Sequence, residues 1–242
     1  MLLTIDIGNT RIKAAVFEEN TLLEIFVFTE EELLNKLNYI LNKFPKIKDV
    51  VIASVGNVEK ELFFLLENKA EIHFITRESK FPFTNLYATL ETLGIDRIIL
   101  ATNATLQFPN QNRLVIDTGT CITYDFIDEN DNYLGGAISP GIRLRYESLN
   151  QQTAKLPLLT KKYPESFIGN STQESIHSGV INGVVLEIDG FIELYKTQYA
   201  KFIIILTGGD AEFLAMRLKN TIFANSNFLL EGLNQTFQYN QK

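Results

Sequence analysis

Two short motifs pair a carboxylate with a glycine at the end of an apolar segment. They read Asp6-Ile-Gly-Asn-Thr10 and Asp117-Thr-Gly-Thr120. A glycine lets the backbone turn tightly and expose its N–H groups, which suits phosphate. An aspartate beside such a turn can hold Mg²⁺ through oxygen or through bound water, as at a triphosphate. The motifs therefore predict phosphate and magnesium chemistry, while a plain hairpin turn with an Asp/Asn cap also accounts for the first one.

The recurrence of the Asp-x-Gly pattern favours a functional role for both motifs. Asn9, Thr10, Arg11 and Lys13 add hydrogen-bond donors or positive charge beside the first turn. If the two turns face one cleft, they can clamp a polyphosphate and its cations from both sides. Asp125 is either a third acid of this site or an outward-facing solvated residue.

Three further segments carry candidate chemistry. Gly94-Ile-Asp-Arg97 is either a helix N-cap with a surface ion pair, or a general base beside a guanidinium that takes an anionic substrate group. Thr207-Gly-Gly-Asp210 either brings backbone close to a ligand or makes a strand-to-helix turn. The segment 135–141, Gly-Gly-Ala-Ile-Ser-Pro-Gly, is a glycine-rich loop or a tight turn between elements.

Other chemistries are excluded by what the chain lacks. It contains no Gly-Lys dipeptide of a P-loop and no G-x-S-x-G elbow. Cys121 is the single cysteine, so no intramolecular disulfide forms, and with two histidines no thiolate or imidazole zinc cage can be built. We expect oxygen ligands for any metal, and structural roles for His73 and His177.

Composition bounds the class of protein. The chain has 242 residues, of which 45% are hydrophobic and 21% charged, with a net charge of −7. That charge has the wrong sign for a nucleic-acid partner or an anionic membrane surface. No stretch approaches ~20 apolar residues, and the N-terminus lacks the features of a signal peptide. We expect a soluble cytoplasmic protein with no nucleic-acid or membrane partner.

Periodicity predicts the elements that position these motifs, in two similar halves. In the first half we expect strands at 2–7, 11–17, 21–28, 49–54 and 71–76, and helices at 30–43, 58–69 and 96–106. In the second half we expect a strand ending in Asp117, strands at 122–127, 133–139 and 202–206, a helix at 173–198 and a final helix near 211–219.

The two halves look like an internal duplication. An apolar strand, an Asp-x-Gly turn and a hairpin recur after 111 residues. This predicts an α/β protein with two facing lobes and a cleft between them, each lobe opening on a hairpin instead of the βαβ crossover of a Rossmann domain. Gly179 and Gly183 share one helical face, so they permit close helix packing within a lobe or across a dimer.

The motifs together resemble bacterial type III pantothenate kinases. The matching pattern is D-x-G-N-T, then G-x-D-R, D-x-G-T followed by T-x-D, G-G-x-I-x-P-G and T-G-G-D, and it spans roughly residues 2–219. This resemblance implies the actin, Hsp70 and sugar-kinase superfamily: duplicated ribonuclease-H-like lobes, here 1–112 and 113–242, with mixed five-stranded sheets and flanking helices. Thr118 and Cys121 depart mildly from the family pattern without removing a proposed ligand.

The resemblance also implies an activity, which is phosphorylation of pantothenate by ATP as the first step of coenzyme A biosynthesis. Asp96 is then the proton acceptor, Asp6 lies near Mg²⁺, and Asp117 helps to bind a monovalent cation, K⁺ or NH₄⁺. The remaining implied contacts fall in two groups. The ATP contacts are Asp6, Ile7, Gly8, Asn9, Thr10, Arg11, Ile12, Lys13 and Thr120, and the pantothenate contacts are Tyr87, Gly94, Ile95, Asp96, Arg97 and Thr172.

The family is typically a cytoplasmic homodimer. Two alternatives to a pantothenate kinase stay open. One is a non-catalytic transcription-accessory relative of the same fold, and the other is a kinase of the superfamily that acts on a sugar or acetate. Retention of Asp6, Asp96, Arg97, Asp117 and Thr120 together favours catalysis.

Overall fold

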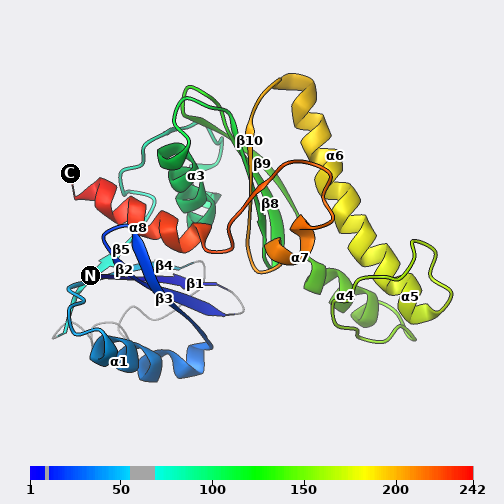
Figure 1. The fold of residues 1–242 in the computed structure, drawn as a ribbon, viewed down its shortest axis with the longest axis horizontal. Coiled ribbons are helices and arrows are strands. Elements are labelled where there is room, and N and C mark those ends of the chain that lie inside the picture. The colour runs from blue at the N-terminus through cyan, green and yellow to red at the C-terminus, as the bar shows by residue number, and fades with distance from the viewer. Residues whose placement is uncertain (9–10, 55–68, 242) are drawn as a thin grey trace. The chain divides into compact units, whose positions relative to one another are not determined.

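The computed structural model describes residues 1–8, 11–54 and 69–241 (Figure 1). The chain divides into two compact units. The first comprises residues 1–110, 127–134 and 227–242, and the second comprises residues 111–126 and 135–226. The division into lobes after residue 112 stays a prediction. In the structure, the C-terminal residues 227–242 belong to the same compact unit as the N-terminal residues 1–110.

The first sheet has five strands in the order β3-β2-β1-β4-β5. Its strands are β1 (Leu2–Ile7), β2 (Ile12–Glu18), β3 (Thr21–Phe28), β4 (Asp49–Ser54) and β5 (Glu71–Phe74). β1 pairs antiparallel with β2 and parallel with β4. Every residue of β1 is buried, as expected of a central strand covered on both faces, whereas β3 alternates in exposure at the sheet edge.

Helices cover both faces of this sheet (Figure 1). On one face, α1 (Leu33–Lys43), which follows the 3₁₀ turn η1 (Glu30–Glu32), buries its leucines against Leu3, Ile5 and Ile7. On the other face, α8 (Phe228–Asn240) contacts β1 and β4, and α3 (Ile95–Gln107) packs beside it. The short η2 turn (Leu90–Thr92) precedes α3. The helix predicted at 58–69 lies almost entirely outside the described residues.

The second sheet repeats the strand order of the first. It reads β11-β10-β7-β8-β9-β6, so β9-β8-β7-β10-β11 corresponds to β3-β2-β1-β4-β5. Its strands are β6 (Thr84–Asn85), β7 (Arg113–Thr118), β8 (Cys121–Ile127), β9 (Asn132–Pro140), β10 (Ile203–Thr207) and β11 (Phe223–Ala224). This order confirms the duplicated α/β fold. The sheet has six strands where five were expected, because the two-residue strand β6 is added beside β9.

The helices of the second unit are α4 (Ile142–Gln151), α5 (Thr172–His177), α6 (Gly183–Gln198) and α7 (Ala211–Ala215). The prediction of one continuous helix over 173–198 was wrong in one respect. A π-helical turn, η3 (Ser178–Asn182), lies between α5 and α6. There the Ser178 hydroxyl donates to the Phe167 carbonyl at 2.5 Å and accepts from Asn182 Nδ2 at 3.1 Å.

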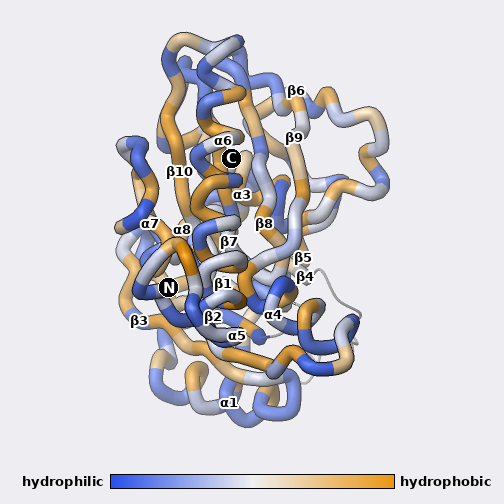
Figure 2. The backbone as a smooth tube through the Cα atoms, turned by 90° about the vertical axis from the view of Figure 1, so that its right-hand side faces the viewer, coloured by the Kyte–Doolittle hydropathy of each residue, from blue (hydrophilic) through white to orange (hydrophobic). Residues whose placement is uncertain are grey.

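The sequence pattern did not predict two of the helices, α4 and α8. In α4 only Ile142 and Tyr146 are buried, so its apolar signal is weak. The last helix is α8, not the one near 211–219, which ends at Ala215. Figure 2 shows the contrast between element types: β10 is hydrophobic along most of its length, whereas α1 alternates as a surface helix does. No helix among the described residues has the length and apolarity that crossing a membrane requires.

Candidate active site

The first Asp-x-Gly turn joins β1 to β2 in the first unit. Asp6 is only 8% exposed and is the register partner of Lys13 across the antiparallel pair. The Gly8 N–H donates to the Arg11 carbonyl at 3.3 Å, which closes the turn. Asn9 and Thr10 lie outside the described residues.

The two isoleucines that flank this turn point elsewhere. Ile7 and Ile12 are 3% and 2% exposed and belong to the hydrophobic core under α1. Only their backbone groups can contact a ligand. Successive side chains of a strand alternate in direction, so Asp6 faces the opposite side of the sheet from Ile7.

A second group of predicted residues gathers at the start of α3, also in the first unit. The Arg97 N–H donates to Asp96 Oδ1 at 2.9 Å, and a Cβ on Gly94 would lie 2.3 Å from the same oxygen. The Asp96 carboxylate is therefore folded back over the helix N-terminus, where the helix dipole stabilises negative charge. Ile95 is 7% exposed, so its side chain belongs to the core.

Arg97 and Tyr87 complete this group. Arg97 is 6% exposed, and its guanidinium carbon lies 5.6 Å from the centre of the Tyr87 ring, within cation–π range. The Tyr87 ring in turn lies 6.2 Å from that of Tyr133. A half-buried carboxylate, a buried guanidinium and an aromatic ring thus meet at one place, which suits a small substrate with a hydroxyl and an anionic group.

Two hydrogen bonds hold these segments in place, and no sequence pattern indicated either of them. Asn85 Oδ1 accepts from the Tyr87 N–H at 3.0 Å, and Arg77 Nε donates to the Leu93 carbonyl at 2.9 Å. Because they fix the backbone before Tyr87 and before Gly94, both are positioning contacts. A lone Asn and a lone Arg in irregular segments carry no periodic signal.

The second Asp-x-Gly turn lies between β7 and β8 in the second unit, and two other segments pack against it. The Gly141 N–H donates to the Thr120 carbonyl at 3.0 Å, and the Asp210 N–H donates to the Thr118 carbonyl at 3.0 Å. The Thr118 hydroxyl donates to the Thr207 carbonyl at 2.7 Å. The motifs at 117–120, 135–141 and 207–210 therefore meet at one place, and whether they bind a ligand there stays a prediction.

Glycine is required at two points of this contact. Gly208 has φ +95°, and a Cβ there would lie 2.3 Å from Asp117 Oδ1 and 2.6 Å from the Thr118 backbone. A Cβ on Gly141 would lie 2.3 Å from the Gly119 carbonyl oxygen and 2.5 Å from that of Thr120. The close approach gathers carboxylate and carbonyl oxygens beside Asp117, and oxygen donors of this kind fit a hard cation.

A half-buried network behind this site was not predicted. Glu187 on α6 accepts from Tyr124 at 3.0 Å, from Ser139 at 2.5 Å and from Arg145 at 2.5 Å. Arg145 Nε also donates to the Pro140 carbonyl at 2.8 Å. The network therefore holds the segment that ends in Gly141. A glutamate on a helix is ordinarily solvated, so no sequence signal marks Glu187.

The network shifts two pKa values. Burial opposes ionisation of Glu187, but the hydrogen bonds from Arg145 and Ser139 outweigh it, so the pKa of Glu187 lies below its ordinary value. Burial, together with the neighbouring Glu187 charge, raises the pKa of the Tyr124 phenol. Tyr124 therefore stays a neutral donor and Glu187 a charged acceptor at neutral pH.

The remaining predicted residues have the following places. Thr172 is exposed at the start of α5, after the N-cap Ser171, and belongs to the second unit, whereas Tyr87 and the 94–97 segment belong to the first. Asp125 is fully buried, so its interpretation as an outward-facing solvated residue was wrong. His177 is buried and within 2.8 Å of the Tyr146 hydroxyl, as a structural histidine should be.

Solved structures with similar folds define the fold class. A ROK family glucokinase from Streptomyces griseus, solved with glucose and AMPPNP, matches with a TM-score of 0.51 and 11% identity over 99% of both chains. A Campylobacter jejuni protein provisionally classed as a Baf family transcriptional activator matches with a TM-score of 0.65 and 25% identity, over 99% of this chain and 98% of its own. The fold is that of the sugar-kinase and actin-like ATPase group.

Sequence comparison identifies the family within that group. The type III pantothenate kinase family model matches residues 2–194. A type III pantothenate kinase from Flavobacterium johnsoniae is 68% identical over 239 residues, which cover 99% of this chain and 98% of the relative. The chain belongs to the type III pantothenate kinase family.

Proposed function

We propose that this chain transfers the γ-phosphoryl group of ATP to the hydroxyl group of pantothenate, giving 4'-phosphopantothenate in the first step of coenzyme A biosynthesis. The observation that carries the proposal is the meeting of Asp96, Arg97 and Tyr87 at the start of α3, in a chain that belongs to this family. In the proposed roles, Asp96 accepts the hydroxyl proton and Arg97 takes the substrate carboxylate.

ATP binding is proposed for the turn from Asp6 to Lys13 and for Thr120. The backbone N–H groups around Gly8 and Gly119 would bind phosphate oxygens, and the charges of Arg11 and Lys13 would add attraction. Asp6 would hold Mg²⁺, and Asp117 with the neighbouring carbonyl oxygens would hold the monovalent cation, K⁺ or NH₄⁺. When bound, these cations spread the charge of the transferring phosphoryl group.

The direct test is ATP consumption by the purified chain with pantothenate, glucose or acetate, each with and without K⁺. We expect turnover with pantothenate alone, and only when K⁺ or NH₄⁺ is present. Turnover with glucose or acetate instead would identify another kinase of the fold. No ATP consumption with any of the three would favour the transcription-accessory alternative and overturn the proposal.

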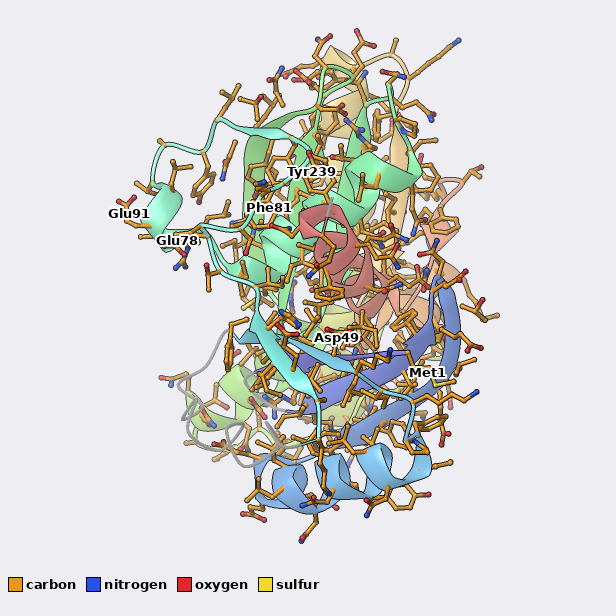
Figure 3. The ribbon with its side chains drawn as sticks, turned by 90° about the vertical axis from the view of Figure 1, so that its left-hand side faces the viewer. Met1, Asp49, Glu78, Phe81, Glu91 and Tyr239 are labelled. Carbon is orange, nitrogen blue, oxygen red and sulfur yellow. The ribbon has the colours of Figure 1, made fainter. Side chains whose placement is uncertain are left out.

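The role of Asp96 has its own test. Asp96→Asn keeps the size of the side chain but removes the base, so turnover should fall by about 10²- to 10⁴-fold. Binding of a non-hydrolysable ATP analogue, measured by calorimetry, should be unchanged. Glu91→Gln is the matched control, because Glu91 is an exposed carboxylate on the preceding η2 turn (Figure 3). Near-normal turnover of Asp96→Asn would overturn the base assignment.

We also propose that the chain acts as a cytoplasmic homodimer without a nucleic-acid partner. The open face of η3 and α6 supports the dimer: a Cβ on Gly179, Gly183 or Gly190 would meet nothing within 4 Å, and Leu186 is 63% exposed. These residues are spaced three or four apart, so they share one helical face. Sedimentation should give a dimer, and Gly183→Glu should give a monomer. A wild-type monomer under the same conditions would refute this part.

A further inference from the structure

A cluster of three possible metal ligands lies away from the residues discussed above. Asp49 begins β4, while Glu71 and His73 lie on the neighbouring strand β5. Asp49 and Glu71 are register partners across the parallel pair, and His73 is two residues beyond Glu71. Side chains two apart on a strand share a face, so all three project from the same side of the first sheet. Figure 3 labels Asp49, which lies on the side of the sheet that faces α8.

The distances suit a metal ion. His73 Nε2 lies 3.0 Å from Asp49 Oδ1 and 3.9 Å from Glu71 Oε1, and one ligand atom from each residue lies within 4.8 Å of both others. Ligand bonds of about 2.0 to 2.2 Å place tetrahedral ligand atoms about 3.4 Å apart. Small side-chain rotations would therefore bring all three atoms to a common ion.

The charge of the cluster also favours a cation. Two carboxylates flank one imidazole, and among the residues that the structure describes neither Asp49 nor Glu71 forms an ion pair with a lysine or arginine. Two carboxylates held this close together attract a cation. The ring of Phe237 on α8 lies 4.8 Å from that of His73 and shields one side of the imidazole.

We propose that Asp49, Glu71 and His73 bind a divalent transition-metal ion, such as Zn²⁺. One nitrogen and two oxygen ligands form a mixed set that such ions accept and that leaves further positions for water. This differs from the oxygen-only metal chemistry expected from the sequence, because one imidazole joins the carboxylates. The ion would tie the edge strand β5 to β4, so its role is to stabilise the sheet edge and is independent of the kinase site.

The alternative to a metal site is a plain hydrogen bond between His73 and Asp49. The two are mutually exclusive at Nε2, since that atom must carry a proton for the hydrogen bond and a free lone pair for the metal. The chain contains two histidines, which makes the distinction measurable. His177 is buried against Tyr146 and serves as an internal control in the same molecule.

The experiment is a Zn²⁺ titration of the tag-free chain followed by the NMR signals of the two imidazole rings, in a buffer without nucleotide or phosphate. His73→Gln assigns the two signals. We expect one equivalent of Zn²⁺ to shift the His73 signal and to leave the His177 signal in place. A His73 signal that stays in place at saturating Zn²⁺ would overturn the proposal.

Variants of the carboxylates complete the test. Asp49→Asn and Glu71→Gln each remove one charged ligand, and each should weaken Zn²⁺ binding by about 10-fold or more, since even outer contacts of metal sites contribute 10- to 100-fold. Glu91→Gln, which changes an exposed carboxylate outside the cluster, should bind Zn²⁺ as the wild type does. Unchanged affinity in both Asp49→Asn and Glu71→Gln would leave His73 as a lone surface ligand and refute the site.

Discussion

The turn after β1 and the turn after β7 share the pattern Asp-x-Gly, but different atoms surround them. Among the residues that the structure describes, the contact that closes the first turn is local, from the Gly8 N–H to the Arg11 carbonyl. The second turn also has a local contact, from the Gly119 N–H to the Cys121 carbonyl, but Gly141, Gly208 and Asp210 from distant segments pack against the backbone of 117–120 as well. The middle residues differ in the same way: Ile7 packs in the core, whereas Thr118 hydrogen-bonds to β10.

This difference fits the two tasks that we propose for the duplicated motif, which are phosphate binding at the first turn and cation binding at the second. The first turn, which the bond from the Gly8 N–H to the Arg11 carbonyl closes, is the one for which we propose phosphate binding. A turn enclosed by other backbone segments brings several oxygen atoms close together, as a cation requires. The two turns should therefore respond differently to equivalent substitutions.

The largest effect is expected at Gly208. Alanine there must adopt a positive φ and place its Cβ 2.3 Å from Asp117 Oδ1. The left-handed backbone and the overpacking together should lower the free energy of unfolding by about 2 to 5 kcal/mol. Chemical denaturation measures this loss, and pantothenate-dependent ATP consumption should fall with it.

Gly209→Ala is the matched control for Gly208→Ala. A Cβ on Gly209 would meet nothing within 4 Å, and its φ lies outside the positive range that strains other residues. We expect wild-type stability for this neighbour. If the free energy of unfolding falls equally in Gly208→Ala and Gly209→Ala, the segment tolerates no side chain at either position. The contrast between the two turns would then have no steric basis.

The next effect concerns the Glu187 network, which supports the second turn. Glu187→Gln removes the charge that Arg145, Ser139 and Tyr124 share, and should cost about 1.5 to 3 kcal/mol of unfolding free energy at neutral pH. The KM for ATP should rise as the segment before Gly141 loosens. Glu193→Gln, on the exposed side of the same helix, is the control.

The same network predicts a pH dependence with a defined sign. The pKa of Glu187 is lowered in the folded chain, so the unfolded chain binds the proton more readily. The stabilisation is fully present above the unfolded pKa of about 4.3 and is lost as the pH falls through the lower, folded pKa. The difference in stability between wild type and Glu187→Gln should therefore shrink below about pH 4. A difference that stays constant down to pH 3 would contradict this role.

Much of this arrangement could be predicted from the chain alone. The strands around Asp6 and Asp117 follow from short apolar runs with turn residues between them, and the repeat predicts the shared strand order. The proposed roles of Gly94–Arg97 rest on the family resemblance and stay predictions. These patterns are local, so they can be interpreted without knowledge of the tertiary packing.

What could not be predicted depends on contacts between distant segments. α8 is rich in Asn and Gln, and it is fixed by partners such as Asn103, whose side chain donates to the Phe228 carbonyl at 2.8 Å. Glu187 gains its role from β8, β9 and α4, none of which its own helix reveals. The cluster of Asp49, Glu71 and His73 requires the register of two parallel strands.

A smaller effect is expected at the middle residue of each turn. Thr118→Val removes the hydrogen bond to the Thr207 carbonyl, at a cost of about 1 kcal/mol. Ile7→Val removes one buried methylene from the core, at a similar cost of about 0.5 to 1.5 kcal/mol. The consequences should separate in the kinase assay: Thr118→Val alone should weaken the response to K⁺. If Ile7→Val weakens the response to K⁺ as much as Thr118→Val does, the two turns do not have different roles.

The smallest change in stability is expected at the glycines of the motifs themselves. A Cβ on Gly119 would make ordinary contacts of 3.7 and 3.8 Å, whereas one on Gly8 would lie 3.2 Å from the Arg11 carbonyl. Gly119→Ala should therefore match or exceed wild-type stability by up to about 1 kcal/mol, because alanine restricts the unfolded chain. Gly8→Ala should be slightly less stable than the wild type.

If the turns bind phosphate through their backbone, the KM for ATP should nevertheless rise in both variants, because each methyl group occupies space that a phosphate oxygen needs. An unchanged KM at Gly8 would move the phosphate site away from the first turn, even with the fold intact.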